Sequence, residues 1–345
     1  MPTLHDTTDG IKVFAKWGAV GIGAILLIFL LVQGGSLFIK TFFPKPVPAP
    51  KAAFGKLPHI IFPASIAKLP TDYQLDTITG TLGQFSDRVA VYKTESAVPG
   101  LLDLQKMRTG ISTTPFTSRE TLITDTEYSW TDPTRPDKKI TTNIVSHDFK
   151  ITSNFLTYSD IVSVAPVDQA SSIKVATDFL THLNLYPLDL DPTRTTTQLL
   201  TLQGTSIFAA SSLSTAQLVR IDFFQSGLNK LPIMYPHPPN SLLYFLIGGS
   251  LTNEILEGTF IHQTVANEAS SYPIIDVQTA YNILKKGDAY IASYFGSSST
   301  ITIKDVYLGY FIGVDKQDFI MPVYVFEGRD GFFAYVSAVS EDLLR

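Results

Sequence analysis

The sequence predicts an α+β protein in which an N-terminal transmembrane helix and a proline-rich stalk precede tandem modules, each a helix on an antiparallel sheet. Residues 17–39 contain no ionisable side chain, and seven of the 21 prolines lie in residues 40–70. From residue 73 onward, short amphipathic helical patterns alternate with strand patterns. The expected domains are a short cytoplasmic head (1–16), the transmembrane helix (17–39), the stalk (40–70), and three α+β modules (71–165, 166–270 and a PepSY-like 271–345).

Residues 17–39 are long and apolar enough to span a membrane. A helix of this length rises about 34 Å, and the hydrocarbon core of a bilayer is about 30 Å thick. A cleaved signal peptide has a shorter apolar region and a cleavage site of the small-x-small type, which does not follow here. We therefore expect a retained single-pass anchor that contacts membrane lipid.

The charges that flank this segment bear on its orientation. Two lysines precede it and four follow it before residue 57, which by the positive-inside rule would place the large domain in the cytoplasm. A short head before a large, Ser- and Thr-rich domain without cysteine is instead typical of an exported protein held by an uncleaved signal anchor. We favour the second interpretation and expect a bacterial cell-membrane protein whose large C-terminal domain is extracytoplasmic.

Composition excludes several classes of protein. Hydrophobic residues make up 45% of the chain and charged residues 17%, which argues against a disordered chain. The absence of cysteine excludes disulfides, thiolate zinc sites and iron–sulfur clusters. After residue 70 the chain has nineteen basic and twenty-nine acidic residues, so it is a poor partner for nucleic acid. We expect no cofactor and no nucleic-acid partner, and the oligomeric state stays open.

The stalk has two halves of different composition. Alternating prolines in residues 44–50 favour an extended polyproline conformation. Residues 54–63 carry apolar side chains that a free linker would not need. We therefore expect this second half to dock on the folded body.

Three amphipathic helices are expected, near residues 97–109, 168–184 and 276–286. The third is the best marked, because Asp276 can cap its first amide groups and Gly287 can end it. Its apolar stripe has the i, i+3, i+4, i+7 spacing of a helix that packs on one face, in Val277, Ala280, Tyr281 and Leu284.

Strands are expected after each helix. A hairpin surrounds the turn at residues 132–137, and further strands are expected at 197–202, 216–224, 241–247, 289–294, 301–312, 321–326 and 332–339. The apolar phase shifts within 301–312, which predicts a bulge near Lys304 and Asp305. The unequal spacing of the helices favours separate modules over a solenoid with a fixed period.

The C-terminal pattern resembles a known family. It reads Ala280-x3-Leu284-Lys285-x-Gly287, then Ile301-x-Ile303-x2-Val306-x-Leu308-x-Tyr310, then Met321-Pro322-Val323-Tyr324-Val325-Phe326-Glu327-Gly328. This pattern resembles the closing repeat of PepSY-like proteins, which implies a helix on a curved antiparallel sheet. The tandem arrangement over residues 165–345 resembles the membrane-anchored regulators that bind cell-wall sensor kinases in Gram-positive bacteria. Residues 54–63 are similar to a segment of uncharacterised single-pass proteins of uncultured small-genome bacteria. None of these resemblances implies a catalytic residue.

Motifs with catalytic or metal-binding chemistry are not found. Ser65 and Ser171 each begin a Ser-x-x-Lys pattern, but chance alone supplies as many in a chain this rich in Ser and Lys. The six histidines show no His-x-x-x-His pairing, and the acids of residues 189–191 and 315–318 do not form a twelve-residue calcium loop. We expect no catalytic, cofactor-binding or metal-binding residue.

These observations predict a non-enzymatic binding or regulatory protein of the cell envelope whose modules bind another envelope protein or a peptide. Two alternatives stay open, an envelope hydrolase or peptidase inhibitor and a structural subunit of a surface assembly. Two buried carboxyl groups that face one cleft would favour the hydrolase.

The residues expected to bind the partner are Tyr324, Phe326 and Tyr310. Pro322 cannot donate a ladder hydrogen bond, so its strand is expected to have an exposed edge. If the valines of this strand pack on the helix, Tyr324 and Phe326 are available to a partner. Tyr324→Ala should then weaken binding with little loss of stability, whereas Val325→Ala should destabilise the module by about 1–3 kcal/mol.

Overall fold

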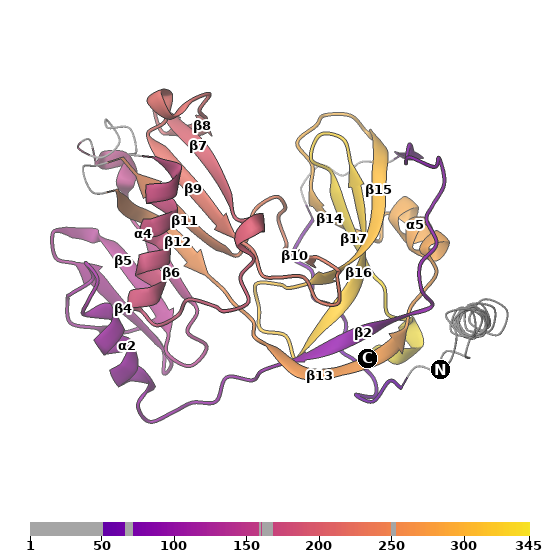
Figure 1. Cartoon of the computed structure of the whole chain (residues 1–345), viewed down its shortest axis with the longest axis horizontal. Helices are drawn as coiled ribbons and strands as arrows, with labels where there is room; N and C mark the ends of the chain where they lie inside the picture. The colour runs from indigo at the N-terminus through magenta and orange to yellow at the C-terminus, as the bar shows by residue number, and fades with distance from the viewer. Residues whose placement is uncertain (1–50, 66–71, 159, 161–167, 250–252) are drawn as a thin grey trace, which may run out of the picture. The chain divides into compact units, whose positions relative to one another are not determined.

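The computed structural model describes residues 51–65, 72–158, 160, 168–249 and 253–345, which belong to one compact unit, residues 50–345. Two β-sheets of nine and eight strands form this unit (Figure 1). The described helices are α2 (Asp103–Ile111), α4 (Gln169–His182) and α5 (Val277–Lys286), with four short 3₁₀ turns, η1 (Phe155–Thr157), η2 (Pro192–Arg194), η3 (Leu213–Thr215) and η4 (Glu341–Leu343).

The nine-stranded sheet is antiparallel throughout and has the order β3-β4-β5-β6-β12-β11-β9-β7-β8. Its strands are β3 (Thr121–Leu122), β4 (Glu127–Asp132), β5 (Arg135–Asn143), β6 (Phe149–Thr152), β7 (Thr196–Gln203), β8 (Ser206–Ala209), β9 (Leu218–Phe223), β11 (Leu243–Gly248) and β12 (Glu254–Phe260). β4 and β5 are the hairpin that the sequence predicts around residues 132–137.

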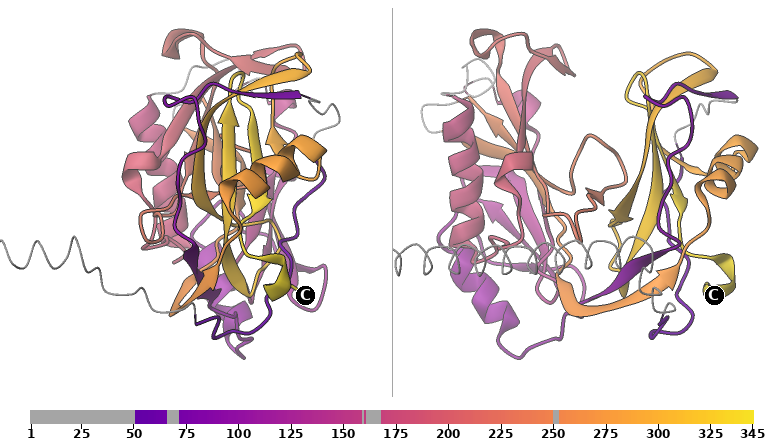
Figure 2. Two further views of the ribbon diagram at one scale, coloured as in Figure 1. Left: turned by 90° about the vertical axis from the view of Figure 1, so that its right-hand side faces the viewer. Right: turned by 45° about the vertical axis from the view of Figure 1, so that its right-hand side comes forward.

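Helices α2 and α4 cover one face of the nine-stranded sheet (Figures 1 and 2). Asp168 caps α4 by accepting a hydrogen bond of 2.5 Å from the Ser171 amide. Phe179 of α4 then packs with Phe149 and Phe245 of the sheet, with ring centroids about 6 Å apart. A smaller apolar cluster that includes Phe155 of η1 is separate from this core.

The eight-stranded sheet contains the order β1-β15-β16-β17-β14, to which β2, β10 and β13 add by pairing with β16, β15 and β2. Its strands are β1 (Asp72–Leu75), β2 (Arg88–Thr94), β10 (Ile233–Met234), β13 (Val265–Pro273), β14 (Tyr290–Ser293), β15 (Thr300–Phe311), β16 (Phe319–Gly328) and β17 (Phe333–Ser337). The register of β15 against β16 shifts between Ile303 and Asp305, which confirms the predicted bulge.

Helix α5 lies on one side of the eight-stranded sheet (Figure 2). The Asp276 carboxylate accepts a hydrogen bond of 2.9 Å from the Thr279 amide, and Gly287 ends the helix at a φ of 86°. The buried residues of α5 are Ala280, Tyr281 and Leu284, three of the four in the predicted stripe. The sequence therefore predicted this helix correctly, because its cap, its stripe and its end are all local signals.

Residues 51–65, which we name the strap, pack in the apolar cluster on the other side of the eight-stranded sheet. The Leu57 amide donates to the Leu343 carbonyl at 2.8 Å, and the Arg345 amide donates to the Leu57 carbonyl at 2.9 Å. Phe62 stacks on Tyr290 with ring centroids 5.1 Å apart. The prediction that residues 54–63 dock on the body is confirmed.

The expected fold class is wrong. Two large sheets form the described body, rather than tandem modules of one helix on one sheet, and the three described α-helices have only nine, fourteen and ten residues. β1 and β2 lie in the segment assigned to the first module, yet they pair with strands near the C-terminus. Strand patterns reveal where the chain is extended but not which strands pair, so long-range pairing was missed.

The predicted membrane anchor receives no support from the structure. Among the residues that the structure describes, no helix is long and apolar enough to cross a membrane. The predicted span, residues 17–39, lies outside the described residues, as do the head and the first part of the stalk. The described helices are amphipathic and each is shorter than the roughly 20 residues that a span needs.

The strap should contribute directly to stability. Leu57 is completely buried, so Leu57→Ala should lower the free energy of unfolding by about 2–5 kcal/mol through the cavity that it leaves. Ile61 is 78% exposed in the same segment, so Ile61→Ala should change it by less than about 0.5 kcal/mol. Urea denaturation of both variants measures the difference, and equal losses would show that the strap is not docked.

Candidate functional site

The three residues expected to bind a partner are buried. Tyr324 is 1% exposed and packs in the α5 core, where its hydroxyl donates to the Ile275 carbonyl at 2.8 Å. Phe326 and Tyr310 lie in the same core, whereas Val325 faces the strap. The helix therefore covers the aromatic side of β16, opposite to the expectation, and we place no partner on these residues.

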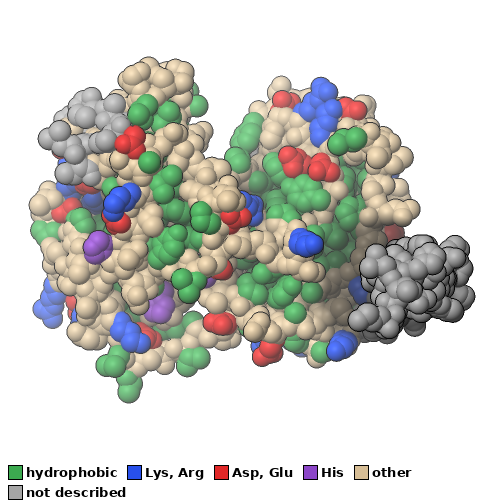
Figure 3. All heavy atoms as spheres, viewed as in Figure 1, with side chains coloured by type: hydrophobic (Ala, Val, Ile, Leu, Met, Phe, Trp, Pro, Cys, Tyr) green, Lys and Arg blue, Asp and Glu red, His purple; other side chains and the backbone are tan. Residues whose placement is uncertain are grey.

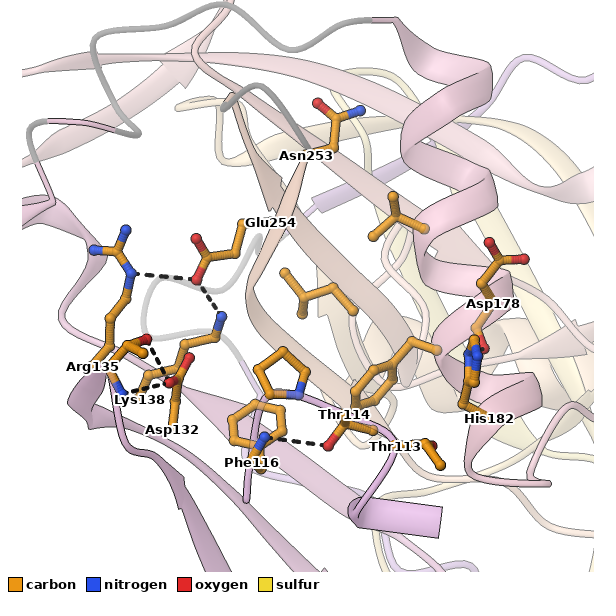
Figure 4. Close-up of a pocket in the computed structure, with 15 residues that line it drawn as sticks. Thr113, Thr114, Phe116, Asp132, Arg135, Lys138, Asp178, His182, Asn253 and Glu254 are labelled. Carbon is orange, nitrogen blue, oxygen red and sulfur yellow. Dashed lines mark hydrogen bonds and ion pairs between the residues drawn. The ribbon is translucent and has the colours of Figure 1, made fainter. Parts of the chain in front are cut away.

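A cavity of about 490 Å³ opens beside the nine-stranded sheet (Figure 4). α4, the loop after α2, the turn between β4 and β5 and the start of β12 form its walls. The lining residues are Thr113, Thr114, Pro115, Phe116, Asp132, Thr134, Arg135, Lys138, Val175, Asp178, Phe179, His182, Asn253, Glu254 and Ile255.

Lys138 is the unusual residue of this cavity, because it is a lysine only 1% exposed. Its ammonium donates to Glu254 Oε1 at 2.5 Å and lies 5.7 Å from the centroid of the Phe116 ring. Lys138 lies in β5 and Glu254 in β12, the two strands on either side of β6. Because β6 ends at Thr152, the two side chains meet beyond the end of that strand.

The Lys138 ammonium has spare donors. It carries three N–H groups, and Glu254 is its one hydrogen-bond acceptor among the residues that the structure describes. A buried ammonium gains free energy from each further acceptor that it finds. Lys138 lines the cavity, so a ligand that displaces the side chains covering the ammonium can supply that acceptor.

Arg135 forms the second positive group of the wall. Its Nε lies 3.4 Å from Glu254 Oε1, its terminal nitrogen donates to Asp160 at 2.8 Å, and its guanidinium lies 4.2 Å from the centroid of the Tyr158 ring. The hydrogen bond with Asp160, together with the charge of Glu254, outweighs burial and raises the pKa of Arg135. The contacts with Asp160 and Tyr158 hold the guanidinium beside Glu254.

Acceptors line the same cavity. Asp132 is buried, and its Oδ1 accepts hydrogen bonds from the amide and the hydroxyl of Thr134 at 2.8 and 2.7 Å. Asp178 accepts from Lys174 at 2.6 Å, and its carbonyl oxygen lies 2.7 Å from His182 Nδ1. The cavity is therefore lined by three carboxylates and two basic side chains, Arg135 and Lys138. No group of three or more metal-ligating side chains occurs in the described part of the chain.

The Lys138–Glu254 pair can be tested by a double-mutant cycle. Lys138→Met leaves Glu254 without its closest partner and should lower the free energy of unfolding by about 3 kcal/mol, since Arg135 remains nearby. Glu254→Gln in the same chain should recover most of that loss, because no carboxylate is then left uncompensated. Denaturant unfolding of wild type, both single variants and the double variant measures the coupling, and strictly additive losses would contradict it.

A second polar cluster joins residues far apart in sequence. His262 Nε2 lies 2.8 Å from Asp189 Oδ1, and Gln225 donates to the other carboxylate oxygen at 2.8 Å. Burial acts to raise the pKa of Asp189, but the hydrogen bond and charge of His262, with the Gln225 hydrogen bond, outweigh it and lower that pKa. The sequence placed Asp189 only among loop acids, because its partners lie 73 and 36 positions away.

Asp189 should make stability depend on acid pH. Its folded pKa lies below the unfolded value of about 3.9, so its contribution is present above that value and is lost as the pH falls through the folded pKa. Asp189→Asn should therefore lose less stability than wild type between about pH 5 and pH 3. His262→Gln removes the main partner of the carboxylate and should flatten the same limb. Parallel curves for wild type and both variants in pH-dependent urea denaturation would refute this role.

Comparison with known proteins adds no assignment. No family model and no curated protein matches the chain. One similar solved structure is an uncharacterized protein from Eubacterium rectale ATCC 33656, with 11% sequence identity and a TM-score of 0.42, over 78% of this chain and 89% of that chain. The resemblance to PepSY-like proteins stays a prediction.

Proposed function

We propose that this chain is a binding protein that holds a small polyhydroxylated ligand, such as a sugar unit, in the cavity at Lys138. The single observation that supports this is the buried Lys138 ammonium, with donors to spare, on a wall that also carries carboxylates. The volume of about 490 Å³ lies within the range of small-molecule sites.

The chemistry of the wall favours hydroxyl groups over an ion. A hydroxyl both accepts and donates, so one group can bond to an ammonium and to a carboxylate. With three carboxylates and two basic side chains on the wall, the charges nearly balance and create no strong field for an ion of either sign. Phe116, Phe179 and Ile255 add apolar surface that suits the C–H groups of a sugar ring.

A hydrolase is the second candidate, because Asp132 and Glu254 line one cavity and glycoside hydrolysis uses two carboxyl groups. Both groups are already engaged within the protein. Glu254 accepts from Lys138 and lies beside Arg135, and Asp132 accepts two hydrogen bonds from Thr134. We therefore rank binding first. The envelope partner, the peptidase inhibitor and the structural subunit stay predictions on which no described contact bears.

Calorimetric titration with a panel of mono- and disaccharides tests the proposal. The double variant Lys138→Met/Glu254→Gln removes the ammonium without leaving its partner unpaired, and it should weaken binding at least tenfold, as expected for loss of a hydrogen bond from a charged donor. Lys93→Met makes the same chemical change in β2 of the other sheet, where Lys93 is half exposed, and should bind as wild type does.

Two results would contradict the proposal. One is an absence of binding by every sugar in the panel, and the other is equal affinity of wild type and the double variant. Release of smaller sugars from the disaccharides, abolished by Asp132→Asn, would instead establish the hydrolase.

A further inference from the structure

Strand β8 is an edge of the nine-stranded sheet that lacks the usual protection. It pairs with β7 alone among the described strands, and all four of its residues are exposed. Ile207 is 44% exposed and Phe208 is 47% exposed. Native sheet edges are commonly shielded by charged residues or proline, and β8 contains neither.

The hairpin around this edge is free of charge. No Asp, Glu, Lys, Arg or His occurs from Thr195 to Val219, a stretch that contains all of β7 and β8. The rest of the chain after residue 70 is acidic, with twenty-nine acids against nineteen bases. In the space-filling view, the upper end of the nine-stranded sheet, where β7 and β8 lie in Figure 1, shows mainly uncharged side chains (Figure 3).

The backbone of Ile207 faces outward. The two-residue turn at Gly204 and Thr205 sets Gln203 opposite Ser206. The Leu202 amide points to the β9 side of β7, where it donates to the Gln217 side chain. The backbone groups of successive residues in a strand point to opposite neighbouring strands, so the residues on either side of Leu202 are the ones that bond to β8. Ser206 and Phe208 therefore bond to β7, and the N–H and C=O groups of Ile207 and Ala209 point away from the sheet.

We propose that β8 pairs antiparallel with β8 of a second copy of this chain, which joins two nine-stranded sheets across a two-fold axis. Opposite residues of an antiparallel pair lie on the same face of the sheet, and a two-fold axis perpendicular to the sheet keeps the faces aligned. In this pair Ile207 lies opposite Ile207 of the second copy, and the outward N–H and C=O groups of the two residues bond to each other.

The charge distribution favours a second copy as the occupant. Two acidic chains repel each other over most of their surfaces, and the uncharged hairpin is a place where they can approach without that repulsion. The two edges also complement each other, because the backbone N–H and C=O groups of Ile207 in one copy can bond to the C=O and N–H groups of Ile207 in the other. An extended peptide of another protein is the competing occupant, and the experiment separates the two.

Disulfide trapping tests the register, because the chain has no native cysteine. In the proposed pair the Cα atoms of the two Ile207 residues lie about 5.5 Å apart, as in a hydrogen-bonded antiparallel pair, which a disulfide can bridge. The two Thr205 residues would lie more than about 10 Å apart, since each is two residues from the axis. In the full chain, Ile207→Cys should form a covalent dimer on mild oxidation at least tenfold faster than Thr205→Cys.

Sedimentation velocity gives a second measurement that does not depend on cysteine. Ile207→Lys places two ammonium groups opposite each other in the pair, and it should weaken dimer formation at least tenfold relative to wild type. Equal cross-linking rates for the two cysteine variants would show random collision and overturn the proposal. A wild-type chain that stays monomeric would also overturn it and leave the edge to an extended peptide.

Discussion

The ion pair of Lys138 and Glu254 is the interaction on which the candidate site depends. It joins two strands on either side of β6 beyond the end of that strand, and it places a buried ammonium on the wall of a cavity. A buried charge is costly unless it is paired. The Glu254 carboxylate offsets the cost of burying the Lys138 ammonium, and the Arg135 guanidinium in turn lies beside the Glu254 carboxylate. The three residues therefore place hydrogen-bond donors and a hydrogen-bond acceptor on one wall of the cavity.

The eight-stranded sheet is organised by burial on both faces. α5 covers one side and the strap covers the other, so seven consecutive residues of β16, from Ile320 to Phe326, are buried. A strand buried on both faces has no side left for a partner. This explains why alternation in β16 gave a misleading binding surface. An exposed edge is found instead at β8 in the other sheet.

Local features could be predicted from the sequence and long-range ones could not. The Asp276 cap, the end of α5 at Gly287 and the bulge before Asp305 each depend on a few neighbouring residues. Lys138 and Glu254 are 116 residues apart, and nothing near either residue indicates the other. The partners of β1 and β2 were missed for the same reason, because apolar packing of the whole sheet selects them.

The central claim is that the cavity at Lys138 holds a polyhydroxylated ligand. Two-dimensional ¹H–¹⁵N NMR of the labelled protein during titration with the sugar that binds best tests it most directly. The account predicts concentration-dependent shifts in the amides of non-proline residues that line the cavity, namely Thr113, Thr114, Phe116, Asp132, Thr134, Arg135, Lys138, Asn253, Glu254 and Ile255. Shifts confined to other surfaces, or no shifts at saturating sugar, would contradict it.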